Sequence, residues 1–135
     1  MFHVLVVDDS VLTREALAET LKREGYGTST AATGREAWIM LYTSMPDLIV
    51  LNLMMPDMDG INFLNLLRHN HHWNETPVIV LTGDPDRDGM LEQAELLGVS
   101  GVIVKGRSAN GLLLTRVKSL VGVNRLSRGL VIPVQ

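Results

Sequence analysis

The sequence predicts an α/β domain built on a parallel sheet, and three observations carry this prediction. Apolar segments of strand length alternate with amphipathic segments of helix length along the chain. The apolar segments lack polar alternation, which is typical of strands buried on both faces beneath helices. The chain has 135 residues, of which 46% are hydrophobic and 20% charged, so it has the size and composition of one globular domain.

The first half of the chain contains three of the expected strands. Its predicted elements are a strand from His3 to Asp8, a helix from a Ser10 cap to about Glu24, a strand from Thr28 to Ala32, a helix from about Gly34 to Thr43 and a strand from Leu48 to Leu51. Gly25 is typical of the residue that follows a helix. Spacing puts four side chains on one face of the first helix: Leu12, Ala16, Thr20 and Leu21.

The second half repeats the pattern. Its predicted elements are a turn-rich loop from Met55 to Gly60, a helix ending near His69, a strand from Pro77 to Thr82, a helix from about Pro85 to Leu97, a strand from Val102 to Val104 and a helix from about Ser108 to Val121. We therefore expect a domain over residues 1–121. Residues 122–135 are interpreted as a C-terminal tail or the stub of a linker.

Composition and charge exclude several classes of protein. The longest apolar runs are of strand length, far short of the roughly 20 residues that cross a bilayer, so no membrane partner is expected. The chain has no cysteine and no secretory signal, which favours the cytoplasm. All 15 acids lie in residues 1–104 with six bases, whereas residues 105–135 hold six bases and no acid. With a net charge of −3, nucleic acid is an unlikely partner for this domain alone.

Polar residues end four of the five predicted strands. They are Asp8 and Asp9, Asn52, Thr82 and Lys105. Parallel strands direct their carboxyl ends to one edge of a sheet, where ligands bind, so these side chains are expected to share one rim. Acids can hold a divalent cation. A hydroxyl and an ammonium can contact phosphoryl oxygens, so this combination of groups suits phosphoryl chemistry.

Over about residues 2–121, the chain resembles the receiver domains of two-component response regulators. The resemblance rests on Val6-Val7-Asp8-Asp9, Pro46-Asp47, Leu51-Asn52-Leu53-Met54-Met55-Pro56-Asp57-Met58-Asp59-Gly60, Val80-Leu81-Thr82-Gly83, Ala94-Glu95-Leu96-Leu97-Gly98 and Val104-Lys105. It implies a doubly wound, flavodoxin-like fold with five helices and five parallel strands in the order 2-1-3-4-5. It also implies that Asp8, Asp9 and the Met54 carbonyl bind Mg²⁺, with Thr82 as the switch hydroxyl and Lys105 as the phosphoryl-contacting lysine.

The chain departs from the family at Asn52, where receivers carry the aspartate that accepts a phosphoryl group. An amide carries no charge and its nitrogen is a poor nucleophile, so Asn52 is not expected to be phosphorylated. The amide oxygen could still approach a cation, but the loss of one negative charge should weaken Mg²⁺ binding or abolish it. Alternatively, the amide could accept a hydrogen bond from Lys105.

Two further departures concern the switch. Gly106 stands where the family usually has a proline, and Val102 where it often has an aromatic residue. Two explanations of Asn52 remain open. One is an engineered Asp-to-Asn change in a working receiver, and the other is a natural pseudo-receiver that acts through protein contacts.

The resemblance implies a signalling module and not an enzyme. Its expected partners are a histidine kinase or phosphotransfer protein and a downstream effector protein. The expected contact face is built from the helix at 85–97, the strand at 102–104 and the helix at 108–121, which could also support a homodimer.

One alternative function belongs to another class. Asp84, Asp86, Asp88, Gly89 and Glu95 match the calcium-loop pattern D-x-D-x-D-G-x₅-E. A predicted strand precedes this segment, whereas a calcium loop follows a helix, and acids at a helix N-terminus are also explained by the helix dipole. A calcium- or other metal-binding domain that uses the Asp84–Glu95 loop is therefore the second hypothesis.

Overall fold

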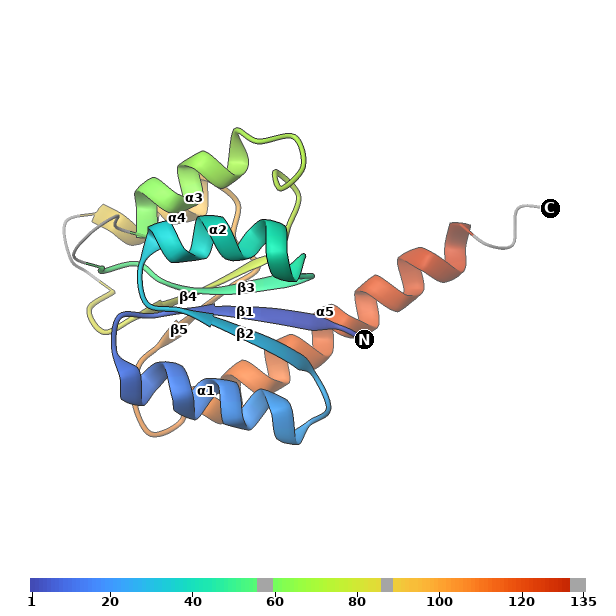
Figure 1. Cartoon of the computed structure of the whole chain (residues 1–135), viewed down its shortest axis with the longest axis horizontal. Helices are drawn as coiled ribbons and strands as arrows, with labels where there is room; N and C mark the ends of the chain where they lie inside the picture. The colour runs from blue at the N-terminus through green and yellow to red at the C-terminus, as the bar shows by residue number, and fades with distance from the viewer. Residues whose placement is uncertain (56–59, 86–88, 132–135) are drawn as a thin grey trace.

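The structure, a computed structural model, describes residues 1–55, 60–85 and 89–131, with side chains described up to residue 122. Five parallel strands form one sheet in the order β2-β1-β3-β4-β5 (Figure 1). The strands are β1 (His3–Val7), β2 (Gly27–Ala31), β3 (Leu48–Asn52), β4 (Val78–Thr82) and β5 (Gly101–Val104). The helices are α1 (Val11–Arg23), α2 (Gly34–Ser44), α3 (Gly60–Arg68), α4 (Met90–Leu96) and α5 (Ala109–Val131). The predicted fold class is confirmed.

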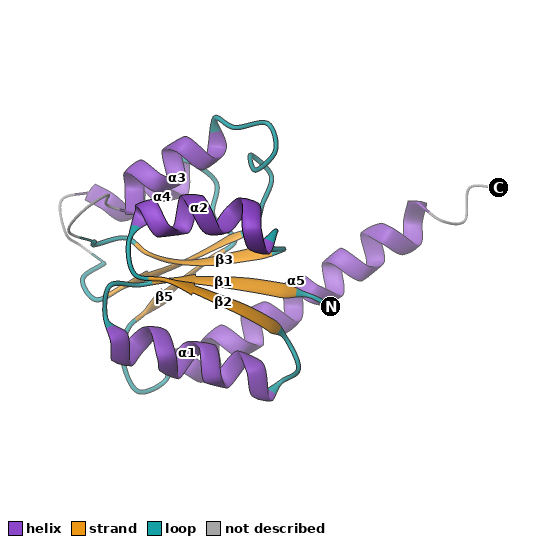
Figure 2. Cartoon of the chain, in the orientation of Figure 1, coloured by secondary structure: helices purple, strands orange, loops and turns teal. Residues whose placement is uncertain are grey.

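Helices cover both faces of the sheet. Figure 2 shows α1 and α5 on one face and α2, α3 and α4 on the other. Side chains of the central strands alternate between the two layers, so Leu5 and Val7 pack beneath α2 and α3 while Val4 and Val6 pack against α1 and α5. Because both layers are apolar, the strands need no polar face.

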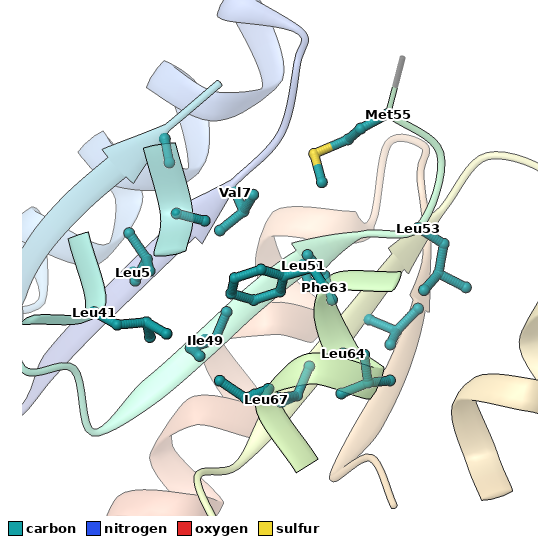
Figure 3. Packing of buried hydrophobic residues seen from close by; sticks show 14 of the residues in the cluster. Leu5, Val7, Leu41, Ile49, Leu51, Leu53, Met55, Phe63, Leu64 and Leu67 are labelled. Carbon is teal, nitrogen blue, oxygen red and sulfur yellow. The ribbon is translucent and has the colours of Figure 1, made fainter. Parts of the chain in front are cut away.

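Close packing beneath α3 is visible in Figure 3. The labelled side chains there come from the sheet, from the loop after β3 and from two helices, and include Leu5, Val7, Ile49, Leu51, Leu41, Phe63, Leu64 and Leu67. Each of these eight side chains is fully buried. A rigid sheet of this kind fixes the positions of the loops that follow its strands.

The buried face of α1 differs from the predicted one. Leu17, Ala18 and Leu21 are buried, whereas Leu12 is 83% exposed and Ala16 is exposed. Leu12 belongs to the first turn of α1, directly after the loop that leaves β1. Spacing alone could not reveal where along the helix the contact with the sheet begins.

Two helix boundaries also differ. Helix α4 begins at Met90 and not near Pro85, and residues 86–88 between them lie outside the described residues. Helix α5 continues to Val131, ten residues past the predicted end at Val121. Glycine lowers helix propensity by about 1 kcal/mol but does not clash with the preceding turn as proline does. Gly122 and Gly129 therefore leave the helix intact.

The elongated α5 leaves the body of the domain. Figure 1 shows its C-terminal half projecting past the end of the sheet. No helix in the described part of the chain has both the length and the apolar character needed to cross a bilayer.

Candidate functional site

The polar strand ends meet at one edge of the sheet, as the sequence predicts. Asp8 follows β1, Asn52 and Thr82 are the last residues of β3 and β4, and Lys105 follows β5. Asp8 is fully buried, Asn52 is 3% exposed and Thr82 is 2% exposed. Hydrogen bonds and an ion pair link Asp8, Asp9, Asn52, Met54 and Lys105 into one cluster.

The side-chain amide of Asn52 lies at the centre of this cluster. Its Nδ2 donates to Met54 O at 2.9 Å, to Asp9 Oδ1 at 3.0 Å and to Asp8 Oδ1 at 3.3 Å. These acceptors belong to the three residues that the resemblance assigns to Mg²⁺. The partial positive charge of an NH₂ group therefore faces the groups expected to bind a cation.

The orientation of the amide follows from its neighbours. Asn52 Oδ1 accepts a hydrogen bond from Met54 N at 3.3 Å, while Nδ2 faces two carboxylates. Exchanging oxygen and nitrogen would direct a carbonyl oxygen at those carboxylates and an NH₂ at a backbone N–H. Only the observed orientation pairs donors with acceptors.

Lys105 pairs with Asp8 and not with Asn52. Its Nζ lies 2.9 Å from Asp8 Oδ2, where the Lys105 side chain is 29% exposed and that of Asp8 is fully buried. The predicted hydrogen bond from Lys105 to the amide is wrong, because the buried carboxylate is a charged acceptor and attracts an ammonium more strongly than a neutral amide does. Asp8 Oδ1 accepts a further hydrogen bond from Ser10 N at 2.9 Å.

Thr82 lies beside this cluster at the end of β4. Its Oγ1 accepts a hydrogen bond from Asp84 N at 3.1 Å, and its carbonyl accepts one from Lys105 N at 2.8 Å. Pairing of Asn52 with Leu81 places Thr82 one residue further along the neighbouring strand. Thr82 therefore forms hydrogen bonds both with the loop after β4 and with the backbone of Lys105.

Two residues that support the site were not identified from the sequence. Arg14 in α1 donates from Nη1 to the carbonyl of Asp8 at 2.8 Å. Gly60 starts α3 so close to β3 that a Cβ there would lie 2.5 Å from both Asn52 O and Leu53 Cα. The position of Arg14, one turn into the helix after the acidic pair, was an available signal. For Gly60, only the sharp turn was predictable.

Mg²⁺ is a hard cation and prefers oxygen ligands. The rim supplies two carboxylates and one carbonyl oxygen of this kind. Asn52 Nδ2 is a hydrogen-bond donor to all three, however, and a cation at that position would face the amide hydrogens at close range. In its observed arrangement the cluster does not fit Mg²⁺.

The calcium-loop hypothesis involves the segment from Asp84 to Glu95. Two of its acids, Asp86 and Asp88, lie outside the described residues. Strand β4 ends only two residues before Asp84, so a strand and not a helix leads into this segment. Within the described residues, no group of three or more His, Asp or Glu side chains could hold a metal ion.

Comparison with protein families gives one assignment. Residues 4–118 match the family described as Response regulator receiver domain. This stretch includes β2 to β5 in full, β1 except for His3, and each rim residue described above.

Individual relatives agree with this assignment. The chain is 35% identical over 103 residues to a probable chemotaxis protein CheY from Rhizobium etli, covering 76% of this chain and 79% of that protein. It is 35% identical over 119 residues to the transcriptional regulatory protein SrrA of Staphylococcus aureus, covering 88% of this chain but only 47% of that longer regulator. A solved signal receiver domain from Bermanella marisrubri is 33% identical with a TM-score of 0.78, and 88% of this chain and 97% of that one align.

Proposed function

Because this chain belongs to the response regulator receiver domain family, we propose that it acts in two-component signalling without phosphorylation at residue 52. The observation that carries the proposal is the amide of Asn52, which stands at the nucleophile position and donates hydrogen bonds to both acids and to Met54 O. A carboxamide forms no acyl phosphate, so the usual chemical step is missing.

The proposal extends to Mg²⁺. Asp8, Asp9, Asn52 and the Met54 carbonyl are the positions that would hold it, and Thr82 and Lys105 those that would contact a phosphoryl group. In this chain Asn52 Nδ2 donates to the oxygen ligands, and Lys105 neutralises Asp8. We therefore expect Mg²⁺ to bind weakly or not at all.

Signalling then depends on protein contacts and not on enzymatic turnover. The proposed partners are a histidine kinase or phosphotransfer protein and a downstream effector, met in the cytoplasm. Exposed apolar side chains on α4, β5 and α5 support an effector face there: Leu96 is 88% exposed, Val104 48% and Leu112 55%. The same face could pair two copies of the chain, which sedimentation over a range of concentrations would test.

The division of the chain is also a proposal. Residues 1–121 form the receiver-like domain, and residues 122–135 form a linker or tail. The continuation of α5 to Val131 supports a helical linker.

The decisive experiment compares the chain with its Asn52→Asp variant. Both are incubated with Mg²⁺ and a small phosphodonor and weighed intact. A phosphoryl adduct on the variant alone supports a receiver disabled at one residue, with Thr82, Lys105 and the acids still competent. If neither protein gains mass, Gly106 or Val102 has also changed the site, which favours a pseudo-receiver. An adduct on the unaltered chain contradicts the proposal.

A further inference from the structure

Helices α2 and α3 expose apolar side chains on the side that faces away from the sheet. The exposed fractions are 65% for Ile39, 53% for Tyr42, 63% for Met45 at the end of α2, and 45% for Leu66 of α3. The two helices are neighbours in the layer above the sheet (Figure 1). The ring of Trp38 connects them, since its centroid lies 6.3 Å from that of Tyr42 and 6.2 Å from that of Phe63. We call the outer surface formed by Ile39, Tyr42, Met45 and Leu66 the α2–α3 face.

Contacts with the loop after α3 hold the Tyr42 ring in place. Trp73, which is buried, packs edge-on against Tyr42 with the ring centroids 5.8 Å apart. Asn70 Nδ2 donates to Tyr42 Oη at 3.5 Å. The α2–α3 face is therefore formed before any partner binds, which lowers the entropic cost of association.

The chain segments around this face contain no charged side chain. Residues 37–46, 60–67 and 69–74 include no Asp, Glu, Lys or Arg. Arg68, which lies between two of these ranges, donates to carbonyl oxygens at the end of α4. The outer sides of α1 and α5, by contrast, carry ion pairs such as that of Lys118 with Glu24.

Met45 has a backbone conformation that favours glycine. Its φ is 47°, and no other non-glycine residue in the described part of the chain has a positive φ. This left-handed region is unfavourable for a residue with a Cβ. Because the side chain is mostly exposed, packing within one copy of the chain offsets little of that cost. A methionine at this position is explained if its side chain packs against another molecule.

The lack of charge determines which partner fits the α2–α3 face. An acidic or a basic protein surface would find no opposite charge there, and an anionic membrane surface would find no basic residue. Apolar and aromatic side chains with few charges are typical of the buried centre of homodimer interfaces. A second copy of the chain supplies the same uncharged surface, so two copies related by a two-fold axis bring no like charges together.

We propose that the α2–α3 face is a self-association surface through which two copies of this chain form a two-fold dimer. Helix α2 has 11 residues and is about 16 Å long, and two packed helices are about 20 Å across. A face of this size is small for a protein interface, so we expect a dissociation constant of about 10–100 µM. The inference goes beyond the proposed function, because it concerns a surface other than the proposed effector face on α4, β5 and α5.

The test is sedimentation of the full chain at concentrations from about 5 µM to about 1 mM. The average mass should rise from that of a monomer toward that of a dimer. Both tryptophans of the chain contact Tyr42, so their fluorescence should change over the same concentration range. Ile39→Glu should weaken the dimer at least about ten-fold, because it buries a charge in each copy. Leu112→Glu, a matched change at an exposed leucine of α5, should leave the dimer unchanged.

Met45→Gly separates association from folding. Glycine adopts the left-handed conformation readily, so this variant should unfold at the same temperature as the unaltered chain or at a higher one. Its dimer should nevertheless be weaker by about three-fold or more, because a contacting side chain is removed. Circular dichroism checks that each variant is folded.

Two results would overturn the inference. One is a chain that stays monomeric up to about 1 mM. The other is a dimer that Leu112→Glu dissociates and Ile39→Glu does not, since the face on α4, β5 and α5 would then join the two copies. Neither result affects the mass comparison between the chain and its Asn52→Asp variant, so failure of this inference is distinguishable from failure of the proposed function.

Discussion

The side-chain nitrogen of Asn52 lies 3.0 Å from a carboxylate oxygen of Asp9. This contact replaces the repulsion that a third carboxylate would produce beside Asp8 and Asp9. Receivers that carry an acid at this position place three negative groups together and depend on a cation to offset them. Here a neutral donor, Asn52 Nδ2, forms hydrogen bonds to both carboxylates instead.

The first prediction concerns this charge balance. Without Mg²⁺, Asn52→Asp should lower the free energy of unfolding by about 2 kcal/mol, because hydrogen bonds to charged groups are lost and a like charge is added. Saturating Mg²⁺ should restore much of the loss, since a ligand that binds only the folded state stabilises it.

Urea unfolding with EDTA and with Mg²⁺ measures both effects. The unaltered chain is the control, and its midpoint should be almost the same in the two solutions. A large shift of its midpoint by Mg²⁺ would show that Asn52 does not prevent metal binding.

The second prediction concerns the ion pair of Lys105 and Asp8. Lys105→Met leaves a fully buried carboxylate without its cation, which costs about 3–5 kcal/mol for a completely buried pair. Because the Lys105 side chain is 29% exposed, we expect a smaller loss, about 2 kcal/mol.

Two variants sharpen this measurement. Lys118→Met removes the pair with Glu24, whose side chains are 56% and 39% exposed, and should cost less than about 1 kcal/mol. Adding Asp8→Asn to Lys105→Met should recover part of the stability, because no buried charge remains. Equal losses from Lys105→Met and Lys118→Met would contradict the assignment of a buried pair.

The third prediction concerns Gly60. In Gly60→Ala the new Cβ would lie 2.5 Å from backbone atoms of β3 and the residue after it, so α3 or β3 must shift, and we expect a loss of about 1–3 kcal/mol. Gly111→Ala is the matched control, since nothing lies within 4 Å of its Cβ position. As an exposed helix residue it should gain up to about 1 kcal/mol. Thermal unfolding of both variants should therefore give shifts of opposite sign.

The sequence predicted the fold because its signals are local and repeated. Strands such as Val4 to Val7 are continuous apolar runs, and four of the five are followed by polar residues at the same edge of the sheet. Parallel topology then brings those residues together without any knowledge of side-chain geometry. Asp8, Asn52 and Lys105 could therefore be assigned to one rim before any contact was known.

Three features of the structure could not be predicted from the sequence, because each depends on the three-dimensional surroundings of the residues or on a sum of small effects. Lys105 could approach either the amide or the carboxylate, and the choice depends on the burial of Asp8. The buried face of α1 depends on where the helix meets the sheet, so Leu12 was assigned to the wrong environment. The length of α5 depends on glycines that weaken a helix without ending it, and their effect is a sum of small terms.

The last prediction concerns Arg68 at the C-terminal end of α3. Its Nε donates to Leu97 O at 2.8 Å and its Nη2 to Gly98 O at 2.7 Å, both at the end of α4, while Nη1 donates to Thr76 O at 2.9 Å. Burial lowers the pKa of this guanidinium. The Arg68 side chain thus connects α3 to the end of α4 and to the loop before β4.

Arg68→Met should therefore cost about 2 kcal/mol, because partly buried carbonyls lose a charged donor. Hydrogen exchange should accelerate most in α4 and in the loop before β4, and less in α1. Arg68→Lys should recover only part of the protection, since a single ammonium cannot reach three carbonyls on two separate segments. Arg23→Met, which removes an exposed pair with Glu19, should leave exchange in α4 unchanged. Acceleration spread evenly over all helices would show that Arg68 supports the whole fold and not the position of α4.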